Sequence, residues 1–327
     1  MAATELPGQG SEAETDADPL ERVAAVELPP RVARLADEYE RAFGDRDRFL
    51  WKWIHALFPE FTLSSVAEEH FAHVRAQKTV LTMYVTVLDD LLERHGDHRT
   101  FDEARKLPVD GATPDPDRAA VDAETFAFVE RVWETFEEGL ADAPRYDEFA
   151  DVFDYDRRQA ETAIEYSGIL SENPHLANLT GARRVEAHNM VLFAYTDVDL
   201  MYSPAFDRTD FGSLRDLLWD LQEMARIGNW LTTWERELAE GDYSAGVVVL
   251  ALQEGVVSPE EVREGGHDEL VERIRDHGIE DRFRRRWSRL YRAARNRRLH
   301  AESVDVDRLV DGMETVYQFH VATRGLK

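Results

Sequence analysis

The segment SLRDLLWDLQEMARIGNWLTTWERELAEG, residues 213–241, has apolar side chains at the spacing of one long helix. In its second half Asn229, Thr233 and Glu237 stand four residues apart, so each lies about 40° further round the helix than the one before. The three side chains therefore form one stripe that offers an amide carbonyl, a hydroxyl and a carboxylate. Oxygen ligands on a rigid helix suit a hard cation such as Mg²⁺. For this stripe alone, a solvated helix face with incidental polar residues is the simpler explanation.

The rest of the chain has the same helical character. Alternating strand patterns, internal repeats and a linker rich in Gly, Ser or Pro are all missing from the sequence. The pattern predicts helices over 31–43, 49–61 with a break near Pro59, 65–95, 119–141, 145–169, 185–202, 213–241, 244–255, 258–276, 280–299 and 304–322, with a loop containing at most one helical turn over 97–118. Residues 20–327 are therefore expected to form one all-α domain, which is too long for a plain four-helix bundle.

The charge balance excludes some partners. The 327 residues include 66 acidic and 39 basic side chains, which gives a net charge of −27. Such a surface repels nucleic acid and anionic membranes, so neither is an expected partner. The acidic residues are scattered through the chain, a pattern that fits a protein kept soluble in concentrated salt, as in the cytosol of a salt-accumulating archaeon.

Other classes of site are excluded by composition. The chain has no cysteine, so disulfides, thiolate zinc sites, iron–sulfur clusters and cysteine nucleophiles are ruled out. No apolar run approaches the roughly 20 residues of a membrane span. Residues 1–19 are small and acidic, which predicts a disordered tail rather than a signal or transit peptide. We expect a soluble, cytoplasmic protein.

A second group of acids lies in LDDLLE, residues 88–93, directly after the uncharged run VLTMYVTVL. Asp89 and Glu93 share a helix face, and Asp90 lies about 100° round, close enough to converge on the same ion. Acids at the end of an apolar helix oppose the helix dipole and are costly unless a cation lies between them. A solvated helix terminus is the alternative explanation.

Together the two groups resemble the metal motifs of class I terpene synthases, enzymes that ionise and cyclise prenyl diphosphates. Asp89, Asp90 and Glu93 match the family's DDxx(D/E) motif. The second motif, (N/D)Dxx(S/T)xx(K/R)E, is matched by Asn229, Thr233 and Glu237 as metal ligands and by Arg236 as the base that touches diphosphate. Trp230 stands in place of the second acid of that motif, a position that is usually not a metal ligand in the family.

The resemblance extends to residues outside the two motifs. Arg183 lies 46 residues ahead of Asn229, where the family has a diphosphate-sensing arginine beside a helix break. Glu186 and Ala187 stand where the family has an acidic linker residue and a small residue. Tyr317 matches the tyrosine of a C-terminal Arg–Tyr pair, but Val316 precedes it in place of arginine.

The resemblance implies an isoprenoid synthase helical bundle with a central cavity and three Mg²⁺ ions held between the motifs. Diphosphate would then be held by Arg183, Arg236 and Arg226, with Tyr317, Glu186 and Ala187 nearby. The expected substrate is farnesyl or geranylgeranyl diphosphate, and the expected product is a terpene hydrocarbon or alcohol. An aromatic wall should shield the carbocation. The candidates for it are Trp51, Trp53, Phe58, Tyr84, Phe193, Trp230 and Trp234, of which Tyr84 and Phe193 are favoured, although a plain core role is the simpler explanation for any single one.

Alternatives remain open at this point. A chain-elongating or head-to-head prenyltransferase of the same fold would normally have two aspartate-rich motifs, and this chain has one. A non-catalytic relative that binds a prenyl diphosphate or a partner protein is the third possibility. The basic run over 282–298 could be a docking face, could surround the diphosphate, or could pair with neighbouring acids. A homodimer is a reasonable expectation.

Overall fold

The computed structural model describes residues 19–44, 46–297, 299 and 301–325, and this part of the chain is helical and contains no strand. The α-helices are α1 (Pro19–Ala24), α2 (Pro30–Ala42), α3 (Arg48–Leu57), α4 (Phe71–Glu93), α5 (His98–Ala104), α6 (Ala123–Leu140), α7 (Tyr146–Glu172), α8 (Leu179–Arg184), α9 (Leu192–Met201), α10 (Phe211–Glu240), α11 (Gly246–Gln253), α12 (Pro259–Glu264), α13 (His267–Asp276), α14 (Ile279–Asn296) and α15 (Val306–Ala322). Short 3₁₀ turns are η1 (Phe58–Phe61), η2 (Glu68–His70), η3 (Pro174–Leu176), η4 (Glu186–Met190) and η5 (Arg208–Asp210). The expectation of an all-α domain is confirmed. The predicted acidic tail lies outside the described residues except for Pro19, which begins α1.

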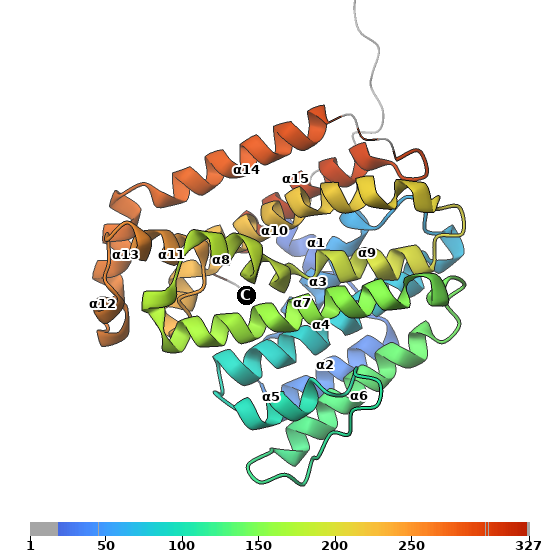
Figure 1. Cartoon of the computed structure of the whole chain (residues 1–327), viewed down its shortest axis with the longest axis horizontal. Helices are drawn as coiled ribbons and strands as arrows, with labels where there is room; N and C mark the ends of the chain where they lie inside the picture. Colours follow the sequence, from blue (N-terminus) through green and yellow to red (C-terminus); the bar gives the residue numbers. More distant parts are fainter. Residues whose placement is uncertain (1–18, 45, 298, 300, 326–327) are drawn as a thin grey trace, which may run out of the picture.

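Two long helices, α4 and α10, organise the packing. α4 contacts α3, α5, α6, α7 and α9, whereas α10 contacts α9, α11, α14, α15 and η4. In Figure 1, α14 lies along one outer side of the molecule and α5 and α6 lie on the opposite side, with α4, α7 and α10 between them. The central position of α4 follows from its sequence, because the uncharged residues 79–88 can be buried on almost every side.

Several of the helices that the sequence predicts begin later or are divided into shorter helices in the structure. The helix expected over 65–95 begins only at Phe71, after the turn η2. The segment 258–276 divides into α12 and α13 at Gly265 and Gly266, whose φ angles of 99° and 81° suit glycine. The loop expected over 97–118 contains α5, because the Asp97 side chain accepts a hydrogen bond from the Thr100 amide and caps a helix there.

The helix expected over 185–202 is also broken, at a position that faces the cavity described below. The turn η4 ends at Met190, and Val191 follows with φ 57° and ψ 11° before α9 begins. A β-branched residue with positive φ is strained, because its Cβ crowds the backbone. This strained residue therefore marks the point where the chain changes direction beside the candidate site.

A buried ion pair and a buried hydrogen bond join α4 to its neighbours. Lys78 and Asp199 are fully buried, and Lys78 Nζ lies 2.6 Å from Asp199 Oδ1, which joins α4 to α9. On another face of α4, the hydroxyl of Tyr84 donates to Glu161 of α7 at 2.9 Å. These links set the rotation of α4, and the rotation decides which of its side chains reach the cavity.

The basic run on α14 largely pairs with acids of the same chain. Arg286 forms an ion pair with Glu223, Arg282 with Glu254, and Arg297 with Asp220. Of the three expectations for residues 282–298, pairing with neighbouring acids is the one that these contacts support. None of the helices in the described residues is both long enough and apolar enough to cross a bilayer.

Candidate functional site

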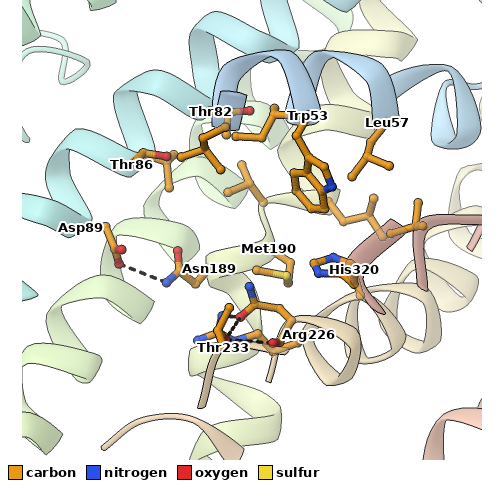
Figure 2. A pocket seen from close by; sticks show the side chains of 18 of the residues that line it. Trp53, Leu57, Thr82, Thr86, Asp89, Asn189, Met190, Arg226, Thr233 and His320 are labelled. Carbon is orange, nitrogen blue, oxygen red and sulfur yellow. Dashed lines mark hydrogen bonds between the residues drawn. The ribbon is translucent and has the colours of Figure 1, made fainter. Parts of the chain in front are cut away.

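A cavity of about 400 Å³ lies between α3, α4, α9, α10 and α15 (Figure 2). Its wall has two different ends. One end carries charged, amide and hydroxyl side chains, which are Arg46, Asp89, Glu93, Arg94, Asn189, Arg226, Asn229, Thr233, Arg236, Glu237, Glu240 and Asp242. The other end is mainly apolar and aromatic, with Leu50, Trp53, Ile54, Leu57, Phe58, Phe61, Val85, Met190, Val191, Leu192, Tyr195, Met313, Val316 and His320 among its residues.

The two motifs singled out in the sequence face the same polar end. Asp89 and Glu93 reach it from α4, and Asn229, Thr233 and Glu237 reach it from α10. Figure 2 shows Asp89 on one side of this end, with Thr233 and Arg226 on another. Helical spacing places each set on one face, and the packing of α4 and α10 brings the two faces to a shared cavity.

Asp90 has a different position from its two neighbours in the motif. Its side chain is fully buried and does not line the cavity. The Tyr39 hydroxyl donates to it at 2.6 Å, and Arg46 donates to it at 2.6 and 3.0 Å. Asp90 therefore anchors Arg46, which does line the cavity, and the metal-ligand role implied for Asp90 stays a prediction without support from this geometry.

The carboxyl groups at the polar end repel one another. Burial raises the pKa of Glu93 well above its usual value, with further contributions from Asp242 and Asp89. Burial and Glu237 raise the pKa of Asp242 to about 7. Burial also raises the pKa of Asp89 to about 6, with a contribution from Asp90 and against the opposing effect of Arg46. This concentration of negative charge favours binding of protons or cations.

The residues present fit Mg²⁺ in two respects. The side chains at this end that could coordinate a metal ion would do so through carboxylate, amide or hydroxyl oxygen atoms, which is the ligand type that Mg²⁺ prefers. The Oε2 atom of Glu237 is buried and has no hydrogen-bond partner among the described residues, so an ion there would satisfy it. Among the described residues, no group of three or more His, Asp or Glu side chains is arranged to hold a metal ion by itself. Mg²⁺ at phosphate sites is commonly held by one or two carboxylates together with phosphate oxygens, which two facing helices allow.

Arg226 is held in the cavity wall by Glu186. The guanidinium donates through two nitrogens to the buried Glu186 carboxylate, at 2.8 Å from Nε. Its third nitrogen donates to Asn229 Oδ1 at 2.5 Å. Glu186 and Ala187 are buried in η4 and do not line the cavity, so Glu186 acts on the site through Arg226.

The other predicted diphosphate-binding residues fall into two groups. Arg236 lines the cavity and forms an ion pair with Glu240. Arg183 does not line it, because Glu223 of α10 accepts hydrogen bonds from it at 2.7 and 3.2 Å. Arg286 binds the same carboxylate at 2.9 Å through each of two nitrogens.

Tyr317 also lies outside the cavity. Its ring packs against Trp287, with 4.6 Å between the ring centroids. The preceding residue, Val316, lines the apolar end instead. An arginine at position 316 would thus project toward the cavity, and its absence here leaves α15 without a cation at that place.

The aromatic wall differs from the expected one. Of the candidates, Trp53 and Phe58 line the cavity, and the others do not. Tyr84 lies five residues before Asp89 and so about 140° round α4, where its ring packs on Trp133. Phe193 packs against Trp219 and lies beneath the guanidinium of Arg215. Contrary to the expectation, neither Tyr84 nor Phe193 lines the cavity, because each ring is buried against other side chains on a face of its helix that is turned away from the cavity.

The remaining aromatic candidates are core residues. Trp51 packs edge-on against Tyr39, Trp230 packs against Phe283, and Trp234 donates from Nε1 to Glu280 at 2.8 Å. All three indoles are almost completely buried. Their burial agrees with the alternative of a plain core role that applied to each candidate.

Many of the cavity residues were not anticipated as site residues from the sequence, among them Arg46, Asn189, Tyr195, Asp242 and His320. Asn189 donates to Asp89 Oδ1 at 3.2 Å and thereby orients that carboxylate. Asp242 follows directly on Gly241, whose φ of 87° ends α10 in a left-handed cap. Gly241, which ends the helix four residues after Glu237, was the signal in the sequence that the chain could turn back toward Asn229, Thr233 and Glu237 at this point.

Comparison of the sequence with models of known protein families and with curated proteins gives no match.

Proposed function

We propose that the protein is a class I terpene synthase that binds a prenyl diphosphate with Mg²⁺, ionises it and cyclises the resulting cation. The observation that carries the proposal is the division of one cavity into two ends. Oxygen-bearing side chains from α4 and α10 line the polar end together with four arginines, whereas apolar and aromatic side chains line the other end. A prenyl diphosphate has the same division into a charged head and a long hydrocarbon chain.

The polar end would hold the head of the substrate. Asp89 and Glu93 on α4 and Asn229, Thr233 and Glu237 on α10 would hold Mg²⁺. When bound, Mg²⁺ would neutralise the diphosphate and make its departure from the allylic carbon feasible.

Arginines complete this end. Arg226 is fixed beside Asn229 by Glu186, and Arg236 lines the cavity one residue before Glu237. A planar guanidinium can hold two phosphate oxygens at once, so both side chains suit the position of a diphosphate. No protein nucleophile is needed for bond cleavage.

The apolar end would hold the hydrocarbon chain and exclude bulk water from the cation. Trp53 reaches the cavity from α3, Phe58 from η1 and Tyr195 from α9. Phe58 and Tyr195 pack edge-to-face with 5.1 Å between their centroids, which gives a rigid wall. Ring faces stabilise positive charge, and a rigid wall limits the conformations in which the chain can close.

The test supplies the purified protein with Mg²⁺ and with farnesyl or geranylgeranyl diphosphate, without isopentenyl diphosphate and in concentrated salt. We expect release of diphosphate and a hexane-extractable terpene detected by gas chromatography and mass spectrometry, both abolished by a chelator. Product that forms only after isopentenyl diphosphate is added would indicate a chain-elongating prenyltransferase. Tight binding without release of diphosphate from either substrate would indicate a non-catalytic relative.

A matched pair of variants on α10 separates the metal site from the helix. Glu237→Gln removes one carboxylate charge from the cavity, whereas Glu235→Gln removes one from the same helix outside it. We expect the first variant to lower turnover by about 10²-fold or more and the second to change it little, because only the first affects charge beside the leaving group. Equal turnover by both variants would show that the metal site is placed wrongly.

A further inference from the structure

Three hydroxyl groups lie in the mainly apolar part of the cavity wall. Thr82 and Thr86 are one turn apart on α4, on the face that continues to Asp89, and both line the cavity. Figure 2 shows these three side chains following one another along the helix. Tyr195 of α9 also lines the cavity, and its phenol oxygen lies 2.7 Å from the Thr82 hydroxyl.

The direction of the hydrogen bonds between these groups is fixed by the backbone. The Thr82 hydroxyl donates its one proton to the carbonyl oxygen of Lys78 at 2.7 Å, because a carbonyl can only accept. The bond between Thr82 and Tyr195 must then run from the phenol to the threonine, which commits the proton of Tyr195 as well. The phenol oxygen therefore presents only lone pairs to the cavity.

This arrangement determines how a water molecule binds there. A water held by Tyr195 must donate a proton to the phenol oxygen, and it keeps its own lone pairs for the space in the cavity. Thr86 is next to Thr82, since Cβ atoms four residues apart on a helix are about 5–6 Å from each other, and its hydroxyl can accept the second proton. Two oxygen partners meet the need of a buried water.

The aromatic part of the wall keeps other water away from this position. The ring of Tyr195 packs on Phe58, and it lies near Phe61 with 6.1 Å between the centroids. The side chain of Tyr195 is 6% exposed. A cation formed beside these rings would meet the water that the protein holds rather than bulk water.

We infer that Tyr195 and Thr86 hold the water molecule that captures the carbocation, so that the product is an alcohol. The inference rests on the proposed terpene synthase function. A lone pair of the water oxygen forms the new C–O bond with the cationic carbon, and the positive charge moves to that oxygen. The oxygen then gives up one proton to the released diphosphate. Prenyl diphosphate and water thus become a terpene alcohol and protonated diphosphate.

The first test identifies the source of the oxygen. The parent protein receives Mg²⁺ and farnesyl or geranylgeranyl diphosphate in water enriched in ¹⁸O, and the products are analysed by mass spectrometry. We expect a cyclic alcohol that carries the label. An alcohol without the label would come from cleavage at phosphorus rather than from capture of water, and it would overturn the inference.

Variants locate the water. Tyr195→Phe keeps the ring on Phe58 and removes the phenol oxygen, and Thr86→Val keeps the shape of the side chain and removes its hydroxyl. Both should still release diphosphate, because ionisation occurs at the polar end and precedes capture. We expect the share of the parent alcohol among the products to fall at least about tenfold, with alkenes in its place.

Two further variants distinguish binding of water from packing. Thr86→Ser keeps the hydroxyl but not the methyl group, so it should retain the parent alcohol. Tyr202→Phe removes a hydroxyl that donates to the Gly139 carbonyl oxygen at 2.8 Å outside the cavity, and this matched control should give the parent product.

The outcomes separate the two proposals. If the parent releases no diphosphate from either substrate, the proposed function fails and the bound water fails with it. If the parent releases diphosphate but makes only alkenes, the inference is wrong and the proposed function stands. The same holds if Tyr195→Phe and Thr86→Val make the parent alcohol in an unchanged share.

Discussion

Neutralising Asp242 should stabilise the metal-free protein. Asp242 lines the polar end of the cavity and is buried, and its Oδ1 accepts a hydrogen bond from the Ser244 amide at 2.8 Å. Asp242→Asn keeps an oxygen acceptor for that amide and removes only the charge. The substitution therefore removes both the cost of burying this charge and its repulsion by Glu237, which together raise the pKa of the Asp242 carboxyl.

The size and sign of the effect follow from this pKa. It rises from an ordinary value of 3.8 to about 7, so the folded state retains a proton that the unfolded state releases between these values. The stability contributed by this group is present below about pH 4 and is lost as the pH rises through about 7. At about 1.4 kcal/mol per unit of pKa, the loss reaches about 4 kcal/mol at pH 8.

The assay is thermal or denaturant unfolding of the parent and Asp242→Asn, without divalent ions, at pH 5 and pH 8. We expect the substitution to raise the free energy of unfolding by up to about 4 kcal/mol at pH 8 and by roughly half of that or less at pH 5. For a chain of this length, each kcal/mol corresponds to about 1–2 °C in Tm.

Mg²⁺ provides the second half of the experiment. Because a divalent cation offsets the same repulsion, Mg²⁺ should stabilise the parent more at pH 8 than at pH 5, and should stabilise Asp242→Asn less than the parent. A variant that is less stable than the parent at pH 8 without metal would refute the reasoning. So would a parent whose stability rises steadily from pH 5 to pH 8.

The remaining predictions concern other parts of the chain. Arg183→Ala should lower the rate of diphosphate release more than Arg184→Ala, since Arg184 is exposed; steady-state kinetics would reveal a reversed order. Lys78→Met should destabilise the fold by about 3–5 kcal/mol because it leaves the Asp199 charge buried and unpaired, and Lys78→Met with Asp199→Leu should recover most of that loss in urea unfolding. Removal of residues 1–18, which include no aromatic side chain, should leave turnover and product unchanged. A shortened protein that makes other water-captured alcohols instead would show that this segment shields the cavity.

The helices and the two oxygen stripes could be predicted from the sequence because both depend on local geometry. Residues four apart share a face of any α-helix, so Asp89 with Glu93 and Asn229 with Thr233 had to project together whatever surrounds them. The composition indicated the fold class in the same way, since an apolar pattern of helical period requires helices packed on helices.

Other features depend on side chains that are distant in sequence. Asp90 lies 100° round the helix from Asp89, and whether its side chain reaches the cavity or the core depends on the rotation of α4. That rotation is set by Lys78, which pairs with Asp199 on α9. The partner of Arg183, Glu223, is likewise 40 residues away along the chain.

The sequence by itself thus determined the fold class, most of the helical segments and the helix faces on which the oxygen-bearing side chains of the two motifs lie. The tertiary structure alone decided which side chains share the cavity: Trp53 rather than Tyr84, Arg226 held by Glu186, and His320 at the apolar end. The physical reason is that helical periodicity fixes directions within one element. Which side chains of different helices come together at one cavity depends on helix packing and on buried ion pairs between residues far apart in the chain.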